Sequence, residues 1–293
     1  MNIAERLTVD CLRAFVDPNR RTQSADPGER AYQLSVEVLR HFFGEQWLIK
    51  HLIKASDSTD FLRRDFSTRE RQVKHGFRVV DLAEMLCNLQ NIEGFDSCVA
   101  QMGHGQIESA YAELDIGKSL YAHEIAFRFV TPIGRKGADY DLDIFYPDGT
   151  MACADTKCKI ETTAFSADSI KHSLGEARKQ LPPDRPGIVF VKVPPHWIEE
   201  EQVRDSMIAA ADTFLQGTQR VVSVKFYVSE IVFVDDKIAQ LMRYREVSNP
   251  RNRFDTGRDW DIFSDREVPS GWNGMPPHWL RLLYFPDGEP KQG

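Results

Sequence analysis

Apolar residues recur every three or four positions through the first third of the chain, which is the spacing of amphipathic helices. The segments 4–16, 29–43 and 73–89 all show this spacing. Prolines and glycines separate the segments, as expected of helix boundaries. The sequence therefore predicts an N-terminal helical region over residues 1–104.

After residue 104 helical spacing alternates with the two-residue period of β-strands. The expected elements, in order, are a helix at 107–118, strands at 124–130, 139–144 and 150–157, a helix at 166–181, a strand at 188–193, a helix at 199–215, and one or two strands within 221–234. Ser166 is positioned to cap the second of these helices, and prolines follow its end. Strands that alternate with helices predict an α/β domain over residues 105–245.

Two of these runs, 139–144 and 150–157, predict a β-hairpin that carries acids on one face. In the first run aspartates alternate with apolar residues, and a strand turns successive side chains to opposite faces. A three-residue loop ending at Gly149 would pair Tyr146 with Thr150, because glycine adopts the left-handed conformation at little cost.

The register of this hairpin decides which acids face one another. The three-residue loop sets Asp141 opposite Asp155, and Asp139 opposite Lys157. A two-residue turn would move Asp155 among apolar side chains, which burial of one face disfavours. Facing aspartates destabilise a strand pair by up to about 1 kcal/mol, and a divalent cation between them removes the repulsion. Such a group suits Mg²⁺, which binds oxygen ligands and keeps several waters. An ordinary hairpin with a solvated acidic face is the alternative interpretation.

Asp141, thirteen further residues and then Asp155-Thr156-Lys157 resemble the metal-site signature of the PD-(D/E)XK nuclease superfamily. The resemblance implies that Asp141 and Asp155 hold the metal ion and that Lys157 positions or activates the attacking water. Two departures from the pattern are Tyr140, where the family has proline, and aspartate in place of the commoner glutamate at position 155. Neither departure removes a ligand.

The same resemblance implies a restriction-endonuclease-like fold, with a central mixed β-sheet flanked by helices. Members of the family commonly carry a glutamate on the helix before the first core strand. Glu113 occupies the similar place at the edge of an apolar stripe, and Glu108 and Glu124 are weaker candidates. Glu113 is therefore a third candidate metal ligand and catalytic residue, with a solvated helix-edge glutamate as the alternative.

The most basic stretch of the protein, 61–78, interleaves its cations with phenylalanines. It is a candidate contact for a nucleic-acid backbone, although such a charge run also suits a solvated helix face. The loop before the hairpin offers two further cations, which are equally consistent with ordinary loop charges. The candidate nucleic-acid-binding residues are Arg63, Arg64, Arg69, Arg71, Lys74, Arg135 and Lys136.

Composition narrows the classes of function. The formal net charge of −7 over 293 residues argues against a protein that coats nucleic acid through bulk electrostatics. Five scattered cysteines favour reduced thiols over disulfides or a zinc site. No apolar run approaches the roughly 20 residues that span a bilayer, and the N-terminus shows no signal peptide, so no membrane association and a cytoplasmic location are expected.

The last segment, 246–293, is rich in proline and tryptophan and is expected to pack on the core as an extension. Trp260, Trp272 and Trp279 suit capping of the core edge, with stacking on bases as the alternative. Lys179 and Gln180, near the end of the helix at 166–181, are weaker site candidates and suit solvation at the surface.

Together, these patterns and the resemblance predict a metal-dependent nuclease that hydrolyses phosphodiester bonds in nucleic acid, with DNA as the expected substrate and Mg²⁺ as the cofactor. Mn²⁺ is expected to substitute for Mg²⁺. Restriction-type members of the family often act as dimers, which leaves a homodimer open. The main alternative is a non-cleaving nucleic-acid-binding or complex-forming module that retains the nuclease fold, and a third is a phosphohydrolase of small nucleotides.

Overall fold

The computed structural model describes residues 5–15, 27–53, 61–64, 67–234 and 237–254. Over these residues the chain divides into two compact units. Of the described residues, the first unit takes those within Met1–Asn91 and Val99–Ile107, and the second takes Ile92–Cys98 and those within Glu108–Gly271. Most of the expected C-terminal extension, with its three tryptophans, lies outside the described residues.

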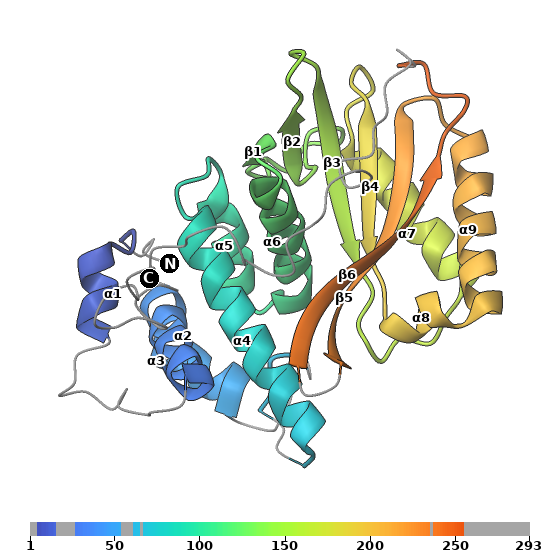
Figure 1. The fold of residues 1–293 in the computed structure, drawn as a ribbon. Helices are drawn as coiled ribbons and strands as arrows, with labels where there is room; N and C mark the ends of the chain where they lie inside the picture. Colours follow the sequence, from blue (N-terminus) through green and yellow to red (C-terminus); the bar gives the residue numbers. More distant parts are fainter. Residues whose placement is uncertain (1–4, 16–26, 54–60, 65–66, 235–236, 255–293) are drawn as a thin grey trace, which may run out of the picture. The chain divides into compact units, whose positions relative to one another are not determined.

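The first unit is helical, as predicted. Its helices are α1 (Val9–Phe15), α2 (Pro27–Phe43), α3 (Glu45–Leu48), the π-helix η1 (Ile49–Ile53) and α4 (Arg69–Leu89) (Figure 1). Helices α2 and α4 meet where the Tyr32 hydroxyl lies 2.8 Å from Nε2 of His75. Helix α4 begins at Arg69 because Thr68 caps it: the Thr68 hydroxyl accepts a hydrogen bond from the backbone N–H of Arg71.

The second unit carries the sheet. Its elements are α6 (Ile107–Ala122), β1 (Ala126–Phe129), β2 (Leu142–Phe145), β3 (Met151–Cys158), α7 (Ala167–Gln180), β4 (Gly187–Lys192), α8 (Pro195–Glu199), α9 (Glu201–Gln216), β5 (Val221–Val234) and β6 (Lys237–Ser248), while α5 (Phe95–Gly103) contributes residues to both units. The predicted order of helices and strands is confirmed from α6 to β5. The predicted helix at 199–215 corresponds to α9, and strand β6 and the short helix α8 are additional.

The six strands form one mixed sheet in the order β1-β2-β3-β4-β5-β6. Strand β2 runs antiparallel to both β1 and β3. Strands β3, β4 and β5 run parallel to one another, and β6 returns antiparallel to β5. The structure thereby confirms an α/β fold with a central mixed sheet flanked by helices.

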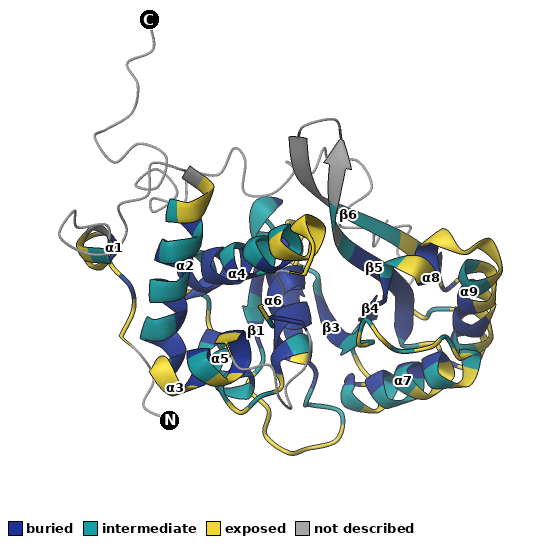
Figure 2. Ribbon diagram, turned by 90° about the horizontal axis from the view of Figure 1, so that it is seen from below, coloured by how far each residue is buried: buried dark blue, intermediate teal, exposed yellow. Residues whose placement is uncertain are grey.

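Helices cover both faces of this sheet. Phe226 and Val228 of β5 belong to a buried apolar core that also contains residues of α7 and α9. Tyr227, between them, points to the other face, where its hydroxyl donates a hydrogen bond to the carbonyl of Ala112 on α6 at 3.1 Å. Figure 2 shows the central strands buried and the outer sides of α7 and α9 exposed. No helix among the described residues is long and apolar enough to cross a membrane.

The register predicted for the hairpin is confirmed. Strand β2 pairs with β3 through Leu142 and Ala154, and the N–H of Tyr146 donates to the Thr150 carbonyl. Gly149 closes the three-residue loop with a φ of 85°, in the region where glycine is least strained.

One part of the hairpin prediction was wrong. The first strand begins at Leu142 rather than at Asp139. The Asp139 carboxylate instead accepts a hydrogen bond from the backbone N–H of Ile133 at 2.8 Å. This bond closes the loop before the hairpin, so Asp139 is held in a loop and does not pair with Lys157 across the strands.

Candidate active site

The acidic cluster begins where the regular β2–β3 ladder ends. Asp141 directly precedes Leu142, the first residue of β2 that pairs with β3, and its backbone N–H donates a hydrogen bond to the Ala154 carbonyl at 2.9 Å. The Asp141 carboxylate accepts a hydrogen bond from the backbone N–H of Thr156, as a carbonyl of a neighbouring strand would. Asp141 is thus hydrogen-bonded to both chain neighbours of Asp155, which fixes the two aspartates side by side.

Asp155 is fully buried in the middle of β3. Its Oδ2 atom lies 2.7 Å from the Nζ atom of Lys157, whose side chain is 22% exposed. Its Oδ1 atom has no hydrogen-bond partner among the described residues. A buried carboxylate oxygen without a partner is costly, and such an oxygen is available to a bound ligand.

Lys157 is held from a second side. Its ammonium group donates a hydrogen bond to Oε1 of Gln180, the last residue of α7, at 2.5 Å. The sequence suggested that Gln180 was solvated, but the structure places it at the site. Its position at the end of the helix that follows the Asp155-Thr156-Lys157 triplet was the available signal.

Glu113 reaches the cluster from α6, where it is 7% exposed. The pKa of Glu113 is raised to about 7: burial is the main cause and the negative charge of Asp155 adds to it, while the hydrogen bond with Cys98 and the charge of Lys157 oppose the rise. The raised pKa shows that Glu113 shares an electrostatic environment with the hairpin acids. Glu124 is instead exposed, in a left-handed backbone conformation after α6, and Glu108 lies in the first turn of α6.

The two aspartates, like Glu113, have pKa values that burial raises. Burial raises the pKa of Asp141 well above its ordinary range, and the charges of Glu113 and Asp155 add to the rise. Burial also raises the pKa of Asp155, while Lys157 lowers it. Three mutually repelling carboxyl groups and one lysine are therefore concentrated at one point of the fold.

Whether these residues fit a metal ion depends on how many protein ligands the ion requires. Within the described part of the chain, no three His, Cys, Asp or Glu side chains lie in an arrangement that could hold a metal ion. Mg²⁺ in phosphate-handling sites needs only one or two carboxylates and otherwise keeps its waters. Asp141 and Asp155, with the unpartnered Oδ1 atom of Asp155, fit this smaller donor set, and Glu113 is close enough to repel both.

The third buried aspartate of the hairpin, Asp143, has a different role. Its Oδ2 atom lies 2.8 Å from Nε of Arg128, and its Oδ1 atom accepts a hydrogen bond from the Tyr140 hydroxyl at 2.9 Å. Arg185 adds a second cation at 3.6 Å. Asp143 is therefore a neutralised structural acid, which leaves Asp141 and Asp155 as the candidate site residues of the hairpin.

The candidate nucleic-acid-binding residues fall into two groups. Arg135 and Lys136 are exposed in the loop before β2, in the same unit as the acids. That loop is tied to α7 by a hydrogen bond from the Gly137 N–H to the Lys179 carbonyl.

The remaining five cations belong to the helical unit. Arg64, Arg69 and Arg71 are exposed, whereas Arg63 and Lys74 are half-buried. Arg78, from the same basic stretch, lies over the Phe61 ring at 4.3 Å and donates to its carbonyl. Arg78 thus has a structural contact, while the exposed arginines keep their charge at the surface.

Comparisons of the chain with family models, with curated proteins and with solved structures find no significant match. The site is therefore characterised by its own geometry: two adjacent aspartates from a hairpin, a lysine paired with one of them, and a glutamate from the preceding helix.

Proposed function

We propose that this protein is a metal-dependent nuclease of the PD-(D/E)XK type that hydrolyses phosphodiester bonds in nucleic acid, with DNA as the expected substrate. One observation carries the proposal: Asp141 is hydrogen-bonded to both neighbours of Asp155, and Lys157 lies 2.7 Å from Asp155. A strand pair built only for stability would not place two acids side by side. The succession of α6, three antiparallel strands, α7 and β4 agrees with the fold expected of such enzymes.

The proposal gives each residue a separate task. Asp141 and Asp155 would hold Mg²⁺ or Mn²⁺, with Glu113 as a third acid near the ion. When bound, the ion would polarise a phosphoryl oxygen and lower the pKa of bound water. Lys157 would orient the attacking water and offset the negative charge that develops on the phosphate. Gln180 is a positioning residue, because it touches only Lys157 in this group.

The direct test compares labelled single-stranded DNA, duplex DNA and RNA as substrates with Mn²⁺ or Mg²⁺ present. Asp141→Asn, Asp155→Asn and Lys157→Ala should each lower the cleavage rate by about 10²–10³-fold, the scale of losing one electrostatic contact to a transition state. Asp168→Asn is the matched control, because Asp168 is a 95% exposed acid on α7. Equal rates in the control and in the site variants would overturn the proposal.

The complete burial of Asp155 favours one alternative, a non-cleaving nucleic-acid-binding or complex-forming module that keeps the nuclease fold. In such a protein the Asp155–Lys157 pair would stabilise the fold only. Binding of nucleic acid without turnover in the same assay, unchanged by the three substitutions, would support this alternative.

A further inference from the structure

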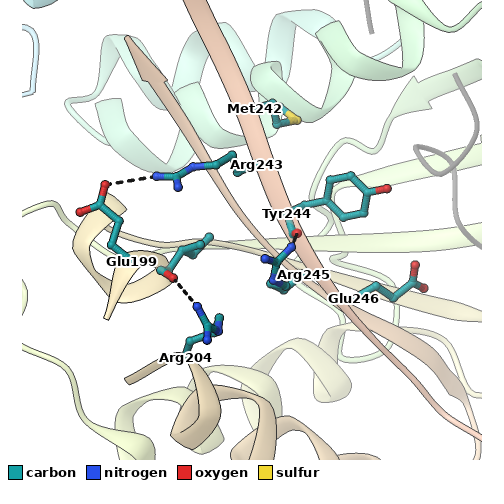
Figure 3. Close-up of a pocket in the computed structure, with 8 residues that line it drawn as sticks. Glu199, Arg204, Met242, Arg243, Tyr244, Arg245 and Glu246 are labelled. Carbon is teal, nitrogen blue, oxygen red and sulfur yellow. Dashed lines mark hydrogen bonds and ion pairs between the residues drawn. The ribbon is translucent and has the colours of Figure 1, made fainter. Parts of the chain in front are cut away.

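A second polar hollow lies in the sheet unit, away from the acidic cluster. It has a volume of about 730 Å³, and Figure 3 shows the residues that line it. They come from α8, the start of α9 and strand β6: Ile198, Glu199, Arg204, Met242, Arg243, Tyr244, Arg245 and Glu246. We call this hollow the arginine pocket.

Strand alternation decides which β6 side chains face this pocket. Arg243 and Arg245 lie on one side of the strand, whereas Met242, Tyr244 and Glu246 point to the other (Figure 3). Arg204 reaches from α9 toward α8, where its guanidinium donates a hydrogen bond to the Ile198 carbonyl at 3.4 Å (Figure 3). Three arginines thus converge on the pocket from two elements.

The acids nearby neutralise only part of this positive charge. Glu199 forms an ion pair with Arg243, its Oε1 atom lying 3.2 Å from the guanidinium. Glu246, on the other face, is bound to the fully buried Lys225. Arg245 is exposed, and its guanidinium donates to the Tyr244 carbonyl with no carboxylate partner among the described residues. Arg204 lies 3.9 Å from Glu201 and 4.0 Å from Asp205, two longer ion pairs, and also donates a hydrogen bond to the Ile198 carbonyl.

A surplus of arginine donors in a hollow of this size suits a ligand with several negative groups, because guanidinium forks match phosphate oxygens. Arg243 and Arg245 are two residues apart on a strand, so their backbones are separated by about 7 Å. This separation allows them to bind different phosphates of one chain. The surplus is notable in a protein whose formal net charge is −7.

The sheet register relates this pocket to the acidic cluster. Lys157 pairs with Val191, Val191 with Phe226, and Phe226 with Arg245, so one cross-strand row joins β3 to β6 on a single face. Three strand spacings of about 4.8 Å place Arg245 about 14 Å from Lys157. Val191 and Phe226 are buried in the core, so a ligand would follow the outer side of the covering helices and take a longer path.

We infer that the arginine pocket binds backbone phosphates of the nucleic-acid strand whose cleavage is proposed above, at least about four nucleotides from the scissile bond, given about 3.4 Å per stacked nucleotide. This inference rests on the proposed function for the identity of the ligand. Arg245 supplies the charge that no carboxylate of the described residues compensates, and Arg243 is held toward the pocket by Glu199.

The test measures binding without metal ion, so that cleavage does not enter. Fluorescence anisotropy in EDTA would compare single-stranded DNA of about four and about sixteen nucleotides, lengths chosen to fall short of and to span the estimated separation. Arg245→Ala, Arg245→Gln and Arg204→Ala remove pocket cations. Arg251→Ala is the matched control, because Arg251 is exposed in the same unit but does not line the pocket.

Each pocket variant should bind the longer strand about tenfold more weakly and lower the salt slope by about 0.7, the value for one phosphate contact on a single strand. The shorter strand should bind all variants alike, and Arg251→Ala should match the parent. Equal affinities and slopes in Arg245→Ala and Arg251→Ala would overturn the inference, as would competition by a free nucleoside triphosphate at matched phosphate concentration. Absence of binding to the parent protein at low salt would overturn it too.

Failure of the inference and failure of the proposed function are distinguishable. If the parent binds the longer strand through Arg245 but does not cleave it with Mn²⁺, hydrolysis is excluded and the pocket stands. If the parent cleaves DNA while the pocket variants bind as well as Arg251→Ala, the pocket inference alone is wrong.

Discussion

The Nζ atom of Lys157 lies 2.7 Å from Oδ2 of Asp155, and it is the only cation within salt-bridge distance of that carboxylate among the described residues. This contact compensates the charge of one oxygen only, since Oδ1 has no hydrogen-bond partner there. By contrast, Asp143, only two residues after Asp141, is bound by two arginines and a tyrosine. The hairpin therefore contains one satisfied acid and one acid with unused coordinating capacity, and the predictions below separate the two.

The first prediction concerns metal binding and stability. Mg²⁺ at ten times its dissociation constant should stabilise the folded protein by about 1.4 kcal/mol, because it binds the folded state alone. For a chain of this size the melting temperature should rise by about 2–3 °C. Thermal unfolding with and without Mg²⁺ measures the rise, which should vanish in Asp141→Asn/Asp155→Asn and persist in Asp168→Asn. A rise of equal size in the double variant would contradict the metal site.

The second prediction concerns pH. An unfolded glutamate ionises near pH 4.3, whereas the pKa of Glu113 is about 7 in the folded protein. Between these values the unfolded chain releases a proton that the folded chain keeps, so without metal ion stability falls as pH rises toward 7.

The measurement is urea unfolding in EDTA of the parent and of Glu113→Gln. The variant should gain roughly 3 kcal/mol of stability over the parent between pH 4 and pH 8, from a difference of about 2.5 pKa units. A stability difference that stays constant over this range would show that Glu113 ionises normally.

The third prediction tests whether Asp143 stabilises the fold without taking part in metal binding. Tyr140→Phe removes the hydroxyl that donates to Asp143 at 2.9 Å. It should lower the free energy of unfolding by about 1–3 kcal/mol, because a buried charged acceptor loses a donor. The stabilisation by Mg²⁺ should stay at the parent value, since Asp143 does not hold the ion. A loss of the Mg²⁺ effect in a variant that still folds would show that the two acids act together.

The fourth prediction concerns Gln180. Gln180→Ala frees the Lys157 ammonium from its helix-side acceptor, so kcat should fall about tenfold, the cost of roughly 1.4 kcal/mol in the transition state. KM should stay unchanged, because Gln180 touches only Lys157 in this group. Lys179→Ala, which removes an exposed side chain one residue earlier, serves as the control. Equal changes in KM and kcat would assign Gln180 to substrate binding instead.

Much of the fold followed from local rules in the sequence. Ser166 capped α7 as expected, accepting the backbone N–H of Ser169. Gly149 fixed the hairpin register, because only one loop length kept Asp155 off the apolar face. The predicted order of elements from α6 to β5 was also confirmed, since strand and helix periods differ clearly in this region.

The failures of prediction involve contacts between distant residues. Strand β6 shows little alternation of apolar and polar residues, so its pairing with β5 was not predicted. Asp143 has the same place in the strand alternation as Asp141, and only the folded chain brings Arg128 and Arg185 to it. The start of the first hairpin strand was misplaced because Asp139 closes a loop onto Ile133.

The three-residue loop that closes at Gly149 has a consequence for how this protein tolerates change over evolutionary time. Pro147 and Asp148 are both exposed in the turn, and other side chains could replace them. A single inserted or deleted residue there would instead rotate every following side chain of β3 to the opposite surface, carrying Asp155 and Lys157 away from Asp141. Functional descendants of this chain are therefore expected to vary the residues of that loop while keeping its length.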